Sequence, residues 1–66
     1  MYIVIELQTN NGVASTIVNS YDTLNEAYQK YYLILSAAAV SSVDVHAAII
    51  LSEHGEVICA DSFEHW

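Results

Sequence analysis

Apolar residues recur at helical spacing between residues 23 and 40, and no Gly or Pro interrupts this segment. At about 100° per residue, one broad face collects Leu24, Ala27, Tyr28, Tyr31, Ile34, Leu35, Ala38 and Ala39. Two serines followed by the β-branched Val43 indicate an end near Val40. The pattern therefore predicts one amphipathic helix over about residues 23–40, with this face toward the core.

The start of the predicted helix has two candidate caps. Thr23 and Glu26 have the spacing of a capping box, in which the hydroxyl accepts from the Glu26 N–H and the carboxylate accepts from the Thr23 N–H. Asp22 is the competing N-cap, since a carboxylate also interacts favourably with the positive end of the helix dipole.

Four shorter segments have the patterns of β-strands, two on each side of the helix. They are residues 2–9, 13–20, 45–51 and 57 to about 63. The first alternates between apolar and polar residues, and the third is a nearly continuous apolar run, typical of a central strand. Asn11-Gly12 predicts a type I′ hairpin turn, and Gly55 marks a second turn. We predict a single α+β domain over residues 1–66, a ββαββ four-stranded antiparallel sheet with the helix on one face.

The predicted elements carry more apolar surface than one helix can cover. Opposite its core face, the helix has a second apolar stripe of Leu33, Ala37 and Val40. One sheet face would carry Ile3, Ile5, Leu7, Val45, Ala47, Ile49, Leu51, Val57 and Cys59. The other would carry Tyr2, Val4, Val18, Ala48, Ile50 and Ile58. We expect the uncovered sheet face to be the one with Val4, Val18, Ile50 and Ile58, and we expect this face or the helix stripe to mediate self-association.

The composition also favours an oligomer. The chain is 55% hydrophobic over 66 residues, and its one cysteine, Cys59, cannot form an internal disulfide. A core this small seldom supplies more than roughly 3–5 kcal/mol of stability without a crosslink, a metal or a partner. We therefore expect a homodimer or a higher oligomer, and two-fold symmetry is the commonest arrangement.

The charge balance restricts the possible partners. Lys30 is the only basic side chain against eight carboxylates, for a formal charge of −7. Direct nucleic-acid binding is disfavoured because it needs Lys or Arg to neutralise phosphates, and the same sign argument disfavours an anionic membrane. An acidic surface suits a basic protein partner, or it serves solubility alone. The candidate partner-binding residues are Glu26, Glu53, Glu56, Asp61, Glu64 and Trp66.

No pattern of catalytic or metal-binding residues is specific enough to assign a site. Ser42, Asp44 and His46 would share a strand face, but same-face neighbours about 7 Å apart do not make a triad. The set of His54, His65, Glu53, Glu56, Glu64 and Cys59 matches no metal-ligand spacing. We expect a protein that is not an enzyme and that needs no metal or cofactor.

The expected compartment is the cytosol. Residues 1–5 lack a positive region and Glu6 interrupts the apolar run, so no signal peptide is expected. No segment reaches about 18 apolar residues, the minimum for a membrane span. One free thiol suits a reducing environment.

The sequence resembles a group of small proteins from phages, prophages and mobile elements of Firmicutes. The likeness rests on the start Met1–Gln8, the tyrosine-rich helix at Tyr28–Tyr32, the helix end Ala37–Ser41 and the strand Val45–Ala48. These motifs are structural, so the resemblance implies a genetic context and no activity. Small acidic proteins in that context often bind a host factor, for instance as inhibitors of bacterial defence systems.

Two functional hypotheses follow. The first is a small acidic binding protein that inhibits or modulates a host protein by occupying its surface. The second is a binder of a small, nucleotide-like ligand with a tyrosine-lined pocket at an oligomer interface. The shortage of Lys and Arg counts against the second, because only backbone N–H groups would remain to neutralise a phosphate.

Overall fold

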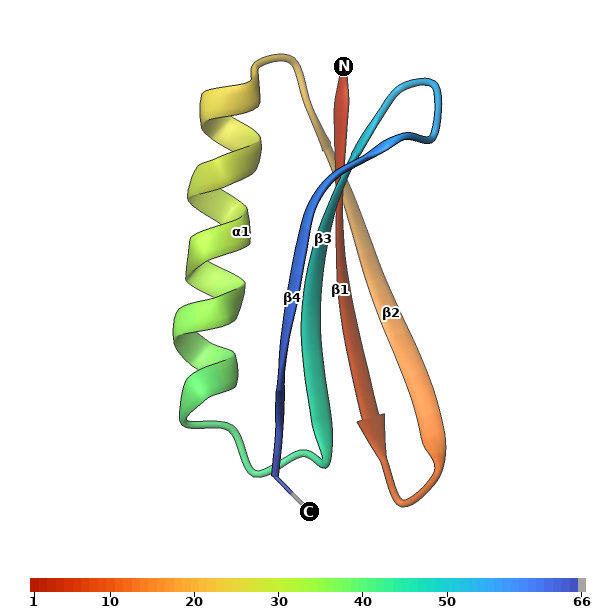
Figure 1. Cartoon of the computed structure of the whole chain (residues 1–66), viewed down its shortest axis with the longest axis vertical. Coiled ribbons are helices and arrows are strands. Elements are labelled where there is room, and N and C mark those ends of the chain that lie inside the picture. The colour runs from red at the N-terminus through yellow and green to blue at the C-terminus, as the bar shows by residue number, and fades with distance from the viewer. Residues whose placement is uncertain (66) are drawn as a thin grey trace.

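The computed structural model describes residues 1–65 and confirms the predicted ββαββ order (Figure 1). The elements are β1 (Tyr2–Asn10), β2 (Val13–Tyr21), α1 (Leu24–Ala39), β3 (Val45–Ser52) and β4 (Val57–Glu64). The four strands form one antiparallel sheet in the order β2-β1-β3-β4. Helix α1 lies along one face of this sheet, and Figure 1 shows no element on the opposite face.

The chain reversals follow the expected turn chemistry. Asn11 has φ 55° and Gly12 has φ 78°, so both central residues of the β1–β2 hairpin have the positive φ of a type I′ turn. Gly55, in the β3–β4 turn, has φ 86°. A residue with a Cβ would be strained at such positions, so the glycines belong to the turn geometry.

Thr23 is the N-cap of α1, which resolves the choice between Thr23 and Asp22. Its hydroxyl accepts from the Glu26 N–H at 3.2 Å, as predicted. The second bond differs from the predicted capping box, because the Glu26 carboxylate accepts from the Thr23 hydroxyl at 2.9 Å. One hydroxyl thus acts as acceptor and donor at once, and it holds the first turn of α1 closed.

The core lies between α1 and the two central strands. Ala27, Tyr31, Ile34 and Ala38 form the buried face of α1. Against them pack Val4 of β1 with Ala48 and Ile50 of β3, and these three are fully buried. The predicted core face of the helix is confirmed except at Ala39, which is exposed. The small residues Ala27, Ala38 and Ala48 let the helix approach the sheet closely.

The prediction of which sheet face stays uncovered was wrong for Val4 and Ile50. Val4 pairs with Ile50, and Ile50 pairs with Cys59, so all three lie beneath α1. The uncovered surface, called the open face from here on, carries Ile3, Ile5 and Leu7 of β1, Thr16 and Val18 of β2, Ala47, Ile49 and Leu51 of β3, and Val57, Ala60, Ser62 and Glu64 of β4. Val18 is therefore on the uncovered surface, as expected, although its neighbours there differ from the predicted ones. Ile58 is 37% exposed and lies at an irregularity of strand β4.

A β-bulge explains why Cys59 changes face. The register shifts between Ile50 and Leu51, so that Leu51 pairs with Val57 while Ile50 pairs with Cys59. Ile58 is the extra residue on β4. Simple alternation puts Val57 and Cys59 on one side, whereas the bulge leaves Val57 on the open face and moves Cys59 under the helix.

The cap of α1 gives a direct test of this arrangement. We predict that Thr23→Ala lowers the free energy of unfolding by about 1 kcal/mol, because the Glu26 N–H loses its acceptor. Urea denaturation measures the change. Thr23→Ser keeps the hydroxyl and is the matched control, with a loss below about 0.5 kcal/mol. Equal losses in the two variants would show that the hydroxyl does not cap the helix.

Candidate functional site

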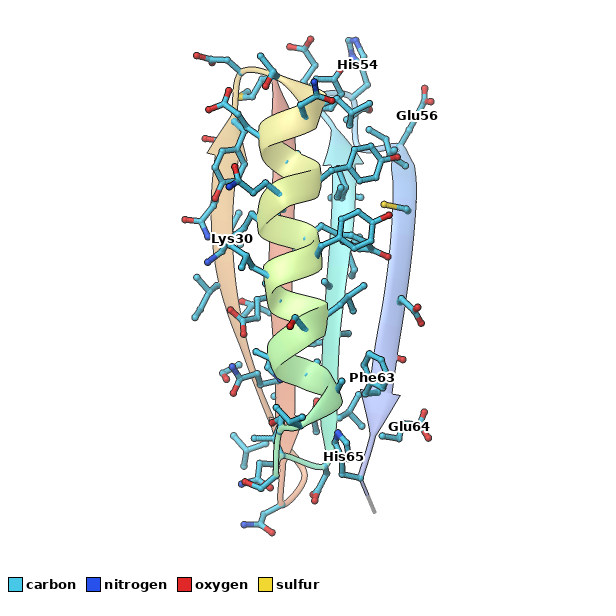
Figure 2. All side chains as sticks on the ribbon, turned by 90° about the vertical axis from the view of Figure 1, so that its left-hand side faces the viewer. Lys30, His54, Glu56, Phe63, Glu64 and His65 are labelled. Atoms are coloured by element: carbon cyan, nitrogen blue, oxygen red, sulfur yellow. The ribbon has the colours of Figure 1, made fainter. Side chains whose placement is uncertain are left out.

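Four carboxylates gather at one end of the molecule, called the acidic end here. Asp22 lies in the β2–α1 connection, Glu26 in the first turn of α1, and Glu53 and Glu56 in the β3–β4 turn. These segments, far apart in sequence, lie at the same end (Figure 1), and Figure 2 places Glu56 beside the start of α1. All four side chains belong to exposed residues. The fold thus brings together three of the predicted partner-binding residues, Glu26, Glu53 and Glu56.

Little positive charge opposes the acidic end. The N-terminal amino group of Met1 lies 3.8 Å from Glu53 Oε1, and both groups are more than half exposed, so solvent screens this contact. The only basic side chain, Lys30, is half-buried and lies on the β2 side of α1 (Figure 2). Lys30 lines a hollow together with Glu26 and compensates that charge in part. The carboxylates of Asp22, Glu53 and Glu56 still give the acidic end a net negative potential toward solvent.

The other predicted partner-binding residues lie elsewhere. Asp61 is on β4, on the side that faces α1, because it pairs with the buried Ala48. Glu64 is at the far end of β4, near the C-terminal end of α1 (Figure 2). Trp66 lies outside the described residues. The six candidates therefore do not form a single surface.

The predicted apolar stripe on the helix is exposed. Leu33 is 61% exposed, Val40 is 87% exposed, and Ala37 between them is exposed too. Leu33 also lines a hollow of about 140 Å³ with Tyr21, Glu26, Gln29 and Lys30. This hollow is smaller than the roughly 300–1,000 Å³ of pockets that bind small organic molecules. It connects the stripe to the acidic end through Glu26.

The Ser42, Asp44 and His46 set is not assembled into a triad. Asp44 accepts from the backbone N–H of Asn11 at 3.0 Å and so ties the α1–β3 connection to the β1–β2 turn. His46 Nε2 donates to Glu6 Oε2 at 2.6 Å beneath the helix. Ser42 is exposed. The Asp and His side chains thus have other partners.

The predicted metal-ligand candidates lie at opposite ends of the molecule. His54 and Glu56 are beside the start of α1, whereas Glu64 and His65 are near its end (Figure 2). His65 Nε2 donates to the Ala38 carbonyl at 2.8 Å and caps the C-terminal end of the helix. Within residues 1–65, no group of three or more His, Cys, Asp and Glu side chains is placed to hold a metal ion.

A buried polar pair that the sequence pattern did not reveal lies between α1 and the sheet. The side chains of Glu6 and His46 are 14% and 6% exposed, and Gln8 Nε2 also donates to Glu6 Oε2 at 3.0 Å. His46 Nδ1 is buried without a hydrogen-bond partner among the described residues. Burial alone raises the pKa of Glu6, but the hydrogen bonds from His46 and Gln8 and the nearby His46 and Lys30 charges outweigh it, so the pKa is lowered.

Three tyrosines form a second cluster along the helix, beside Cys59 of β4. The rings of Tyr28 and Tyr32 stack with centroids 6.0 Å apart, and Tyr31 meets Tyr32 edge-on at 5.3 Å. Burial and the neighbouring Cys59 sulfur raise the pKa of Tyr31 to about 12, and Cys59 also raises the pKa of Tyr28. The Tyr28 and Tyr31 hydroxyls stay neutral at physiological pH, and these two rings pack at the α1–β4 edge. Tyr32 is 61% exposed and extends the cluster to the surface.

The comparisons with known proteins add no relative. No protein family, curated protein or solved structure matches this chain. In the part of the chain that the structure describes, α1 is too short and too polar to cross a membrane, and no other helix is present. The acidic end, the apolar stripe on α1 and the open face are therefore the features that bear on function.

The Glu6–His46 pair predicts an acid-sensitive contribution to stability. The folded-state pKa of Glu6 lies below its ordinary value of 4.5, so ionised Glu6 stabilises the fold above that pH. This contribution is lost as the pH falls through the folded-state pKa. We predict that the wild type loses more free energy of unfolding than Glu6→Gln between about pH 5 and about pH 3 in urea denaturation.

The exposed Glu56 supplies the control for this titration. Glu56→Gln should retain the acid sensitivity of the wild type, because it leaves the buried pair intact. Identical pH dependence in the wild type and Glu6→Gln would contradict the assigned role of Glu6.

Proposed function

We propose that this protein binds a larger protein with a basic surface and modulates it by occupying that surface. The observation that carries the proposal is the acidic end, where Asp22, Glu26, Glu53 and Glu56 converge from separate segments with one terminal amino group as counter-charge. The resemblance to small phage and mobile-element proteins supports a host protein, such as a component of a defence system, as the target.

The acidic end would act mainly on the rate and selectivity of encounter. Exposed ion pairs contribute only about 0.2–1 kcal/mol each, so charge alone gives weak complexes. Complementary charge nevertheless raises association rates strongly at low salt and disfavours acidic competitors. A basic partner would therefore be captured quickly, and the capture would weaken as salt screens the charges.

The exposed stripe on α1 would supply the apolar contact that affinity requires. Leu33 lies next to the acidic end through the hollow that it shares with Glu26, and Val40 extends the stripe to the other end of the helix. An apolar patch flanked by charge is the usual anatomy of a protein interface, with an anchoring centre and a polar rim. Binding along α1 would leave the open face of the sheet free.

The test is capture of a basic protein by immobilised wild type at low salt, with release at high salt. We predict that Glu53→Gln/Glu56→Gln reduces capture by roughly tenfold, because it removes two charges from the acidic end. Asp61→Asn/Glu64→Gln removes the same number of charges from β4 and is the matched control, with capture close to wild type.

Two results would contradict the proposal. If both double variants lose capture equally, net charge rather than the acidic end determines binding. If the wild type captures no basic protein at low salt, the proposed partner class is wrong.

A further inference from the structure

The open face of the sheet is almost free of charge. The four strands place one carboxylate on this side, Glu64, whose partner Val45 is at the far end of the sheet. The other carboxylates lie in the connections, on α1 or on the side of the sheet that faces α1. A chain with a formal charge of −7 therefore has one broad surface on which it does not repel a second copy.

The open face is large enough for a specific dimer. Strands of 8 or 9 residues at about 3.3 Å per residue, spaced about 4.8 Å apart, span roughly 500 Å² in projection. The accessible area of a face covered by side chains exceeds its projection. Two copies would thus bury more than the roughly 1,000 Å² that marks a biological interface.

The relief of the open face is self-complementary. Large side chains follow one another on β1, whereas a hollow of about 350 Å³ lies over β3 and β4. Its lining residues are Ala47, Ile49, Ala60, Asp61 and Ser62, of which three are small and uncharged. Cross-strand rows run Val18, Ile5, Ile49, Ala60 and then Thr16, Leu7, Ala47, Ser62. In each row, the β2–β1 half carries a bulky aliphatic residue, Ile5 or Leu7, and the β4 end carries a small residue, Ala60 or Ser62.

We propose that two copies pack through their open faces, about a two-fold axis that runs along the strands. This axis places β1 over the partner's β3 and β2 over the partner's β4. Leu7 of one copy then meets the partner's Ala47, and Val18 meets the partner's Ala60, so a large residue lies over a small one at these two positions. Ile5 meets the partner's Ile49, which gives an aliphatic contact at the centre of the interface. Sheets stacked in this way are about 10 Å apart, with their strands nearly aligned.

Charge also selects this axis over the alternative. Strand β4 carries Asp61 and Glu64 and follows Glu56, whereas β2 carries no charged residue. An axis across the strands would bring the two acidic β4 strands together. The axis along the strands places each acidic β4 over a neutral β2. This dimer is independent of the proposed function, since it uses the face opposite α1.

The first test is the mass in solution of the full chain by light scattering at micromolar concentration. The wild type should have twice the monomer mass of 7.3 kDa. Ile49→Glu should raise the dimer dissociation constant by roughly 100-fold, because it puts an unpaired charge into the interface. Leu33→Glu, on the exposed helix stripe, is the matched control and should remain dimeric.

Far-UV circular dichroism separates dissociation from unfolding in these variants. Ile49 is half-exposed in the isolated subunit, so Ile49→Glu should keep the wild-type spectrum. A monomeric wild type, or dissociation by Leu33→Glu with Ile49→Glu still dimeric, would overturn the proposal.

A charge pair tests the axis. Val18 and Ala60 lie on opposite edge strands within one subunit, so a charge pair there acts only between copies. Val18→Lys and Ala60→Glu should each weaken the dimer by roughly tenfold, and the double variant should recover wild-type dimerisation. If the axis ran across the strands, each edge strand would lie over its own copy in the partner, so the double variant would bring like charges together. A double variant weaker than either single variant would therefore overturn the proposed axis.

Discussion

A single helix can cover only one face of a four-stranded sheet, and this limit determines which side chains of the protein are buried and which are left exposed. Helix α1 packs on the face that carries Val4, Ala48 and Ile50, all fully buried. The same docking encloses the Glu6–His46 pair, whose hydrogen bond of 2.6 Å compensates for burying both groups. The aliphatic side chains of the opposite face are not covered by α1. Within residues 1–65, no second helix covers these side chains, so the uncovered surface characterises the structure as much as the core does.

Charge is distributed in a way that fits this division. The exposed carboxylates concentrate at the acidic end and along β4, while β2 has none. When charge is segregated in this way, a strongly acidic chain can offer a nearly neutral surface to a second copy and an acidic surface to a different protein. The open face lies on one side of the sheet, whereas the stripe on α1 lies on the other side and the acidic end lies at one end of the molecule. Occupation of one therefore leaves the other accessible, and a dimer would present two acidic ends to its targets.

Local sequence signals predicted the elements well, whereas long-range relations could not be inferred from them. The Thr23–Glu26 spacing and the Asn11-Gly12 turn depend on neighbouring residues, and both features are present. The covered face could not be identified by alternation, because both sheet faces are apolar and Glu6 looks like a solvent-facing residue. Its partner His46 is 40 positions away, so no spacing rule connects them. The bulge at Ile58 likewise arises from pairing between β3 and β4, and it alone moves Cys59 beneath the helix.

Contact between the open faces of two copies can be observed directly in solution. Nuclear Overhauser spectra of a mixed sample, with one labelled and one unlabelled copy, report contacts between subunits only. Val18 and Ala60 occupy opposite edge strands of one subunit, so a cross-peak between their methyl groups would come from the dimer. If the dimer forms as proposed, Val18 and Ala60 give such cross-peaks. Intermolecular cross-peaks confined to Leu33 and Val40 on α1, or none at micromolar to millimolar concentration, would contradict it.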